Sequence, residues 1–150
     1  MYNYWAFLGV IYLSILTYQD YKNNRLVDDR FNAIMLGLTI SLISHTNNSI
    51  WYLVSLTLIL LLLYAFLRKT KPLGEGDINS VSWIFYGFGI ISPATLILFI
   101  IIFSVYTILY YAIKFIFTKI IKKSIMQPTA FYGVIWLSFL TNTLLNGFLI

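Results

Sequence analysis

Apolar residues follow one another in six long stretches along the chain, each interrupted by a short polar or glycine- and proline-containing segment. Because a helix crosses the hydrocarbon core of a bilayer with about 20 mainly apolar residues, this pattern predicts an all-α membrane protein, a bundle of six transmembrane helices. The two shortest stretches are expected to thin the bilayer around them. The predicted helices are Tyr2–Tyr18, Phe31–Ser44, Ile50–Leu67, Ile78–Ile91, Ala94–Phe117 and Pro128–Ile150.

Composition supports a membrane protein rather than a soluble one. Of the 150 residues, 60% are hydrophobic and only 10% charged, whereas a soluble domain carries roughly a quarter charged residues. Six spans fill the chain, so we expect a single domain over residues 1–150. The first stretch lacks a basic leader region and an A-x-A-like cleavage site, which favours a retained span over a cleaved signal. The absence of cysteine excludes disulfides, thiolate zinc sites and cysteine nucleophiles.

The charged residues predict the orientation of the bundle. With six crossings, the segments after the first, third and fifth helices lie on one side of the membrane, and they hold all ten basic residues and all five acids. By the positive-inside rule this side is cytoplasmic, so both termini are expected on the external side of the plasma membrane. The net charge of +5 is thereby explained by topology, and no nucleic-acid partner is expected.

Two of the acids are placed where an ionisable group is costly. Asp20 falls at the cytoplasmic end of the first helix and Asp77 at the cytoplasmic start of the fourth, so both are expected at the same depth. An acid at the edge of a span is a functional-site hypothesis by default. The alternative is that both are loop residues paired with Lys22, Arg25 or Lys71, which would contribute little.

The segment "KPLGEGD" leads into Asp77. Gly74 and Gly76 have no Cβ, so they allow positive φ and the close approach of another backbone, such as an extended substrate. Asp77 would then open the fourth helix, where the helix dipole favours a carboxylate. The segment is equally compatible with a tight turn in which Asp77 is the N-cap of a helix beginning at Ile78. Ser80 adds a polar group near Asp77, for hydrogen bonding within the bundle or for support of the site.

Together, "YQDYKNNRLVDD" at the end of the first helix and "GEGD" at the start of the fourth resemble the prepilin and preflagellin peptidases. These are six-span, membrane-embedded aspartyl proteases with a G-x-G-D motif. The resemblance implies that Asp20 and Asp77 are the catalytic pair. It also implies a prepilin-like or preflagellin precursor as substrate, cut between a short basic leader and an apolar helix. The spacing of Asp20, Lys22, Arg25, Val27 and Asp28 is similar to the archaeal branch of the family.

Two aspartates suffice for this chemistry, without a metal or cofactor. Carboxyl groups a few ångströms apart share one proton, so one activates water as a general base and the other acts as the acid. Sequence does not distinguish which is which. Three further acids, Glu75, Asp28 and Asp29, would attract the basic leader, unless they are simply solvated loop acids. Arg25 would steady Asp20.

The chain also departs from parts of the family pattern. It has no cysteine and no room for the cysteine-rich insert of many bacterial members, so methyltransferase activity is not expected. Presenilin-like proteases share G-x-G-D, but their Tyr-Asp pair lies on the immediately preceding helix, whereas two spans separate Asp20 from Asp77 here.

Non-enzymatic hypotheses remain alongside the peptidase. The same acids would serve an ion or proton relay in a small carrier, although a relay requires polar groups continuing across the bilayer. A precursor-binding assembly factor is a third reading. The expected partners are thus a precursor protein and the lipid bilayer, while the identity of the precursor and the oligomeric state are left open.

Overall fold

The computed structural model describes residues 2–23, 29–70, 75–121 and 132–147, apart from the side chains of residues 20–23, 29, 75, 76, 118, 120 and 121. Within these residues the fold is all-α, with no strand, which confirms the all-helical part of the predicted fold class. The helices are α1 (Tyr2–Asn23), α2 (Asp29–Ser41), the 3-10 turn η1 (Leu42–His45), α3 (Ile50–Thr70), α4 (Glu75–Ile91), α5 (Pro93–Ile121) and α6 (Tyr132–Leu145).

The helices extend beyond several of the predicted bounds. α1 continues past Tyr18 to Asn23, because the polar residues after the apolar run include no glycine or proline to end the helix. α4 begins at Glu75, three residues before the predicted Ile78, and α5 ends at Ile121 rather than Phe117. The predicted last helix begins and ends in segments that lie outside the described residues.

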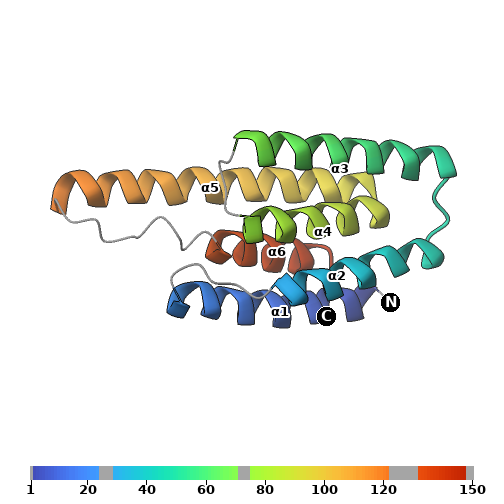
Figure 1. The fold of residues 1–150 in the computed structure, drawn as a ribbon, viewed down its shortest axis with the longest axis horizontal. Coiled ribbons are helices and arrows are strands. Elements are labelled where there is room, and N and C mark those ends of the chain that lie inside the picture. The colour runs from blue at the N-terminus through green and yellow to red at the C-terminus, as the bar shows by residue number, and fades with distance from the viewer. Residues whose placement is uncertain (1, 24–28, 71–74, 122–131, 148–150) are drawn as a thin grey trace.

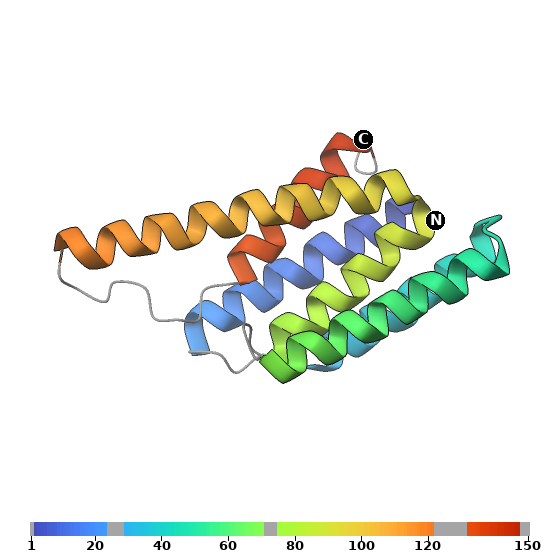
Figure 2. The same ribbon diagram turned by 90° about the horizontal axis from the view of Figure 1, so that it is seen from above.

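Successive helices run in opposite directions (Figures 1 and 2). The end of α1, the start of α4 and the start of α6 therefore lie toward one end of the bundle, and both termini lie toward the other (Figure 1). α5 has 29 residues, a length of about 43 Å at 1.5 Å per residue, and it protrudes beyond the other helices at the first end.

The centre of the bundle is α4, which packs against α2, α3, α5 and α6. Its Trp83 and Phe88 join Trp5 of α1 and Phe139 of α6 in an aromatic cluster with ring centroids 5.3–6.0 Å apart. Several of these pairs meet edge to face, the arrangement that ring quadrupoles favour. Close approach requires glycine at Gly87, where a Cβ would overlap the Trp5 indole.

Polar side chains close the end of the bundle that holds the termini. Ser49 and Ser92 cap α3 and α5 by accepting hydrogen bonds from the backbone N–H groups of Tyr52 and Thr95, both at 3.2 Å. The carbonyls of Gly89 and Ile90, in the last turn of α4, accept hydrogen bonds from Tyr52 Oη and Asn48 Nδ2, both at 2.6 Å. The final carbonyls of a helix lack partners inside it, so these bonds let α4 end without exposing them.

α3 and α5 differ from α4 in their surroundings. α3 and the Pro93–Phe117 part of α5 are long and apolar enough to cross a membrane, by length and composition. Their outward faces consist of aliphatic and aromatic side chains that the rest of the bundle leaves exposed, among them Leu58, Leu61, Leu62, Phe66, Ile97, Ile101, Ile108 and Phe115. Apolar exposure this extensive is unusual for a soluble monomer and typical of a surface that contacts lipid or protein.

Candidate active site

The two expected catalytic residues belong to the end of α1 and the start of α4, which lie toward the same end of the bundle (Figure 1). Asp20 lies in the last turn of α1, and its side chain lies outside the described residues. Asp77 is the third residue of α4 and is half-buried. The two acids therefore belong to helix ends on the same side of the bundle, while their equal depth in a membrane stays a prediction.

The start of α4 corrects the prediction for the double-glycine segment. Gly76 and Asp77 belong to the first turn of the helix, so Gly76 is not part of a turn before it and Asp77 is not its N-cap. A carboxylate in the first turn is still favoured by the helix dipole, because the effect of the dipole is concentrated in that turn. Gly74, Arg25 and Asp28 lie outside the described residues, as does the side chain of Glu75.

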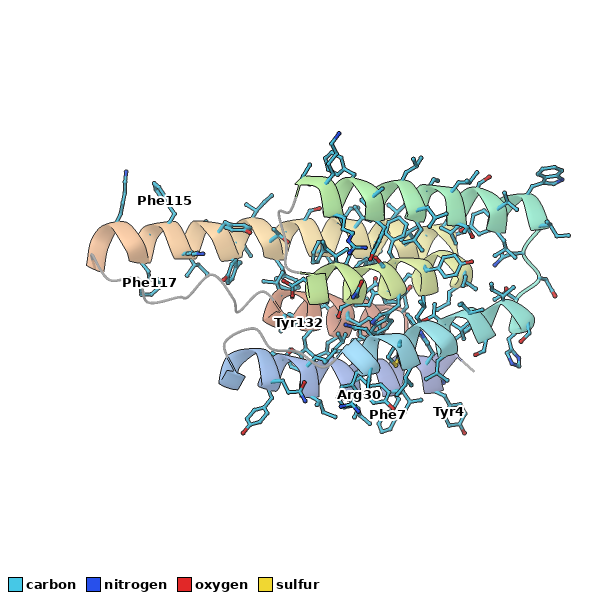
Figure 3. All side chains as sticks on the ribbon, in the orientation of Figure 1. Tyr4, Phe7, Arg30, Phe115, Phe117 and Tyr132 are labelled. Atoms are coloured by element: carbon cyan, nitrogen blue, oxygen red, sulfur yellow. The ribbon has the colours of Figure 1, made fainter. Side chains whose placement is uncertain are left out.

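One turn along α4 from Asp77, Ser80 lies in a buried polar cluster that joins three helices. Its Oγ is 2.7 Å from Oδ1 of Asn32 in α2 and 3.0 Å from the hydroxyl of Tyr132 in α6. Ser80 and Tyr132 are 0% and 2% exposed and Asn32 is 4% exposed, so water does not compete for these bonds. Figure 3 shows Tyr132 at the start of α6.

The direction of these hydrogen bonds follows from the indole of Trp83. Its Nε1–H can only donate, and it lies 3.1 Å from the same side-chain atom of Asn32, which must therefore be the amide oxygen. Since that oxygen only accepts, Ser80 donates its single hydroxyl hydrogen to Asn32. The same Ser80 Oγ is also the donor toward the Tyr132 hydroxyl, at 3.0 Å, so its hydrogen is shared between two acceptors.

Tyr132 also contacts the helix of Asp20. Oγ1 of Thr17 lies 3.5 Å from the Tyr132 carbonyl oxygen, while donating its hydrogen at 2.6 Å to the carbonyl of Leu13 in its own helix. Thr17 is three residues before Asp20, as Ser80 is three residues after Asp77, and residues three apart lie on neighbouring positions of a helix face. A single tyrosine thus reaches both acid-bearing helices one turn from the acids.

A groove of about 450 Å³ lies on another side of Asn32, between α2, α3 and α4. Its walls are largely apolar and include Leu36 and Leu60, with Tyr64, Asn79 and Ser82 as further lining residues. The Tyr64 hydroxyl is 3.4 Å from Nη1 of Arg68, at the end of α3. Asn32 therefore both lines this groove and belongs to the cluster with Ser80 and Tyr132.

Three of the residues in this cluster, Asn32, Tyr132 and Thr17, were not predicted as site residues. Their position along the sequence could have indicated them. Each is a polar residue near a predicted helix end, and the predicted six-span topology assigns all three ends to the same side as the acids. Ser80 was predicted, and its burial among hydrogen-bond partners accounts for the polar position in an otherwise apolar helix.

Among the residues that the structure describes, no three His, Asp or Glu side chains come together in a way that would hold a metal ion. Comparison of the chain with protein-family models, with curated proteins and with solved structures finds no match. The features of this chain that bear on its function are therefore the acids, the polar cluster and the arrangement of the helices that carry them.

Proposed function

We propose that the protein is a membrane-embedded aspartyl endopeptidase that uses Asp20 and Asp77 to remove the short basic leader from prepilin-like or preflagellin precursors. The observation that carries the proposal is the convergence of the acid-bearing ends of α1 and α4 on Tyr132, through Thr17 and Ser80. Acids 57 positions apart in sequence thereby belong to neighbouring helix ends.

The mechanism that we propose follows from the chemistry of paired carboxyl groups. Two such groups at short range hold one proton between them, because a second negative charge there is costly. The ionised group takes a proton from water, which attacks the scissile carbonyl, and the protonated group polarises that carbonyl and then protonates the leaving amine. The pair returns to its starting protonation state at the end of the cycle.

In the proposed topology all six helices cross the plasma membrane, with the acids near the cytoplasmic face. The exposed apolar surfaces of α3 and α5 support contact with lipid. The described basic residues Arg30, Arg68, Lys69, Lys114 and Lys119 fall in the halves of α2, α3 and α5 nearest the acids, in accord with the positive-inside rule. A precursor that enters with its apolar helix in the bilayer would present the leader junction at this level.

The test is cleavage of a prepilin-like precursor by the full chain in proteoliposomes. Wild type is expected to release the leader, and Asp20→Asn and Asp77→Asn are each expected to lose at least about a thousandfold in kcat, because neither general acid–base role survives in an amide. Asp29→Asn is the matched control: it makes the same change at the same end of the bundle and is expected to keep kcat, with an effect on KM at most. Full activity in Asp20→Asn or Asp77→Asn would contradict the proposal. So would a wild-type protein that cleaves no precursor with a basic leader.

A further inference from the structure

We infer that Tyr132 is a positioning residue that sets the separation of α1 and α4 at the end where Asp20 and Asp77 lie, by contacting Thr17 of one helix and Ser80 of the other. The expected effect of Tyr132 on the reaction rate rests on the proposed function. Tyr132 belongs neither to the proposed catalytic pair, Asp20 and Asp77, nor to the G-x-G-D motif.

The two acid-bearing helices are held together differently in their two halves. Far from the acids, α1 and α4 meet directly, because the indole of Trp5 lies against Gly87 and its ring centroid is 6.0 Å from that of Trp83. Nearer the acids, α6 contacts both helices through Tyr132, and α2 also packs against both, with the ring of Phe31 5.3 Å from that of Tyr12 in α1. The spacing of α1 and α4 there therefore depends in part on what α6 places between them.

Tyr132 is the first residue of α6, and its two polar ends face different helices. Its carbonyl oxygen is 3.5 Å from Thr17 Oγ1, and its hydroxyl is 3.0 Å from Ser80 Oγ. The side chain is 2% exposed and Ser80 is 0% exposed, so water cannot replace the bond between them if it is lost. Removal of the hydroxyl would leave Ser80 bonded to Asn32 in α2 and would remove this bond between α4 and α6.

The separation of the helices matters because a carboxyl pair works only over a short range. A displacement of about 1 Å can cost as much as a hundredfold in rate. Separation also weakens the repulsion that makes the pair lose its protons in two well-spaced steps. A dyad that is held farther apart should therefore be active over a narrower range of pH, with both limbs of the pH–rate profile moving inward.

The experiment compares Tyr132→Phe with Tyr106→Phe in the full chain, reconstituted in proteoliposomes with a prepilin-like precursor. Tyr106 is a matched control because its hydroxyl lies 3.1 Å from Thr141 Oγ1 and joins α5 to α6, away from α1 and α4. Tyr132→Phe is expected to lower kcat about ten- to a hundredfold with KM within about twofold, and to narrow the pH–rate profile. Tyr106→Phe is expected to keep the kcat and the profile of wild type. The charged groups described toward this end are the same in both proteins: Asp77, Arg30, Arg68, Lys69, Lys114 and Lys119.

A second variant approaches the same bond from the other side. Ser80→Ala removes the hydroxyl that bonds to the Tyr132 hydroxyl and is expected to narrow the pH–rate profile in the same way, even if one of the two variants folds poorly. A drop in kcat by the same factor at every pH in both Tyr132→Phe and Ser80→Ala would mean a smaller folded fraction rather than a changed dyad, and would overturn the inference.

A distance measurement tests the inference without any cleavage. The chain has no cysteine, so spin labels on Asp20→Cys and Asp77→Cys report only the separation of α1 and α4. Adding Tyr132→Phe is expected to lengthen or broaden the distance distribution, whereas adding Tyr106→Phe is not. An unchanged distribution overturns the inference even if the peptidase is active. If wild type cleaves no precursor, the proposed function fails while the distance still decides the role of Tyr132.

Discussion

The central helix α4 differs from the two long apolar helices α3 and α5 in how much of it is buried. The apolar helices are mostly exposed, whereas α4 is mostly buried although it carries several polar side chains. In the most apolar 18-residue stretch of α3 and of α5, only 6% of the residues are buried. α4 carries Asp77, Asn79, Ser80 and Ser82, yet every residue from Trp83 to Ile90 is buried. Side chains that water would drive inward thus lie outside on α3 and α5, whereas a helix that carries several polar side chains lies at the centre.

This difference in burial indicates which interactions stabilise each helix in the bundle. In water, exposed leucines and isoleucines would be buried to reduce apolar surface, so the outer faces of α3 and α5 are suited to a lipid solvent. For α4 the stabilising contributions are close packing of aromatic rings and hydrogen bonds to neighbouring helices, which are the interactions that remain when the solvent is itself apolar. The polar groups of α4 therefore lie where partners exist for them, and the candidate site is at one end of that polar interior.

The largest effect is expected from removing a buried ring. Phe139 is fully buried and packs against Trp5, Trp83 and Phe88, so Phe139→Ala should leave a cavity that lowers the free energy of unfolding by about 3–5 kcal/mol. The matched control is Phe66→Ala on α3, where the ring is 62% exposed and the change should be within about 0.5 kcal/mol. Unfolding titrations with SDS in bicelles measure both values. An equal decrease in the free energy of unfolding in the two variants would show that the buried ring and the exposed ring contribute equally to stability.

A charge on the outer surface tests the lipid contact itself. Leu62 is 71% exposed near the middle of α3, so Leu62→Arg should raise the apparent free energy of membrane insertion by about 2.5–3.5 kcal/mol. Trp51→Arg, at the start of the same helix and 82% exposed, should cost much less because it lies near the interface. A glycosylation-based insertion assay measures both variants. If Leu62→Arg had no more effect than an ordinary surface substitution, this face would contact water.

A smaller effect is expected where two helices approach most closely. Gly87→Ala would place a Cβ against the Trp5 indole, and the resulting overpacking should cost about 1–3 kcal/mol. Gly37→Ala in α2 is the control, because nothing lies within 4 Å of a Cβ there. That substitution should be neutral or stabilise the protein by up to about 1 kcal/mol through helix propensity. Thermal unfolding of the two purified variants in detergent distinguishes them, and a gain in stability from Gly87→Ala would contradict the close contact.

Much of the fold could be predicted from the sequence, because uninterrupted apolar runs and the breakers between them determine where each helix lies. The ends were less predictable: α1 continues through Gln19–Asn23 and α4 begins at Glu75 because helix formation does not require apolar residues. The same limit explains why Asp77 is not the N-cap that the tight-turn alternative assigned to it. Asp77 is the third residue of α4 because the backbone of Glu75 and Gly76 is already helical, which the motif alone does not specify.

The candidate site was predictable only in part for a different reason. Asp20 and Asp77 are conspicuous because charge is rare in this chain, and Ser80 because it is close to Asp77. Asn32, Thr17 and Tyr132 are ordinary residue types whose importance arises from three-dimensional contacts between α1, α2, α4 and α6. No local pattern marks such contacts, since each partner is at least 48 positions away from the residue that it meets.

The most direct test of the central claim is whether positions 20 and 77 face a common space. The chain has no cysteine, so the double variant Asp20→Cys/Asp77→Cys can be treated in native membranes with a short bifunctional maleimide and analysed for an intramolecular cross-link. We expect efficient cross-linking of this pair, and none between Asp20→Cys and a cysteine that replaces the outward-facing Leu62. Failure of the 20–77 pair to cross-link, although each cysteine alone reacts with a monofunctional maleimide, would contradict the claim that the two aspartates form one site.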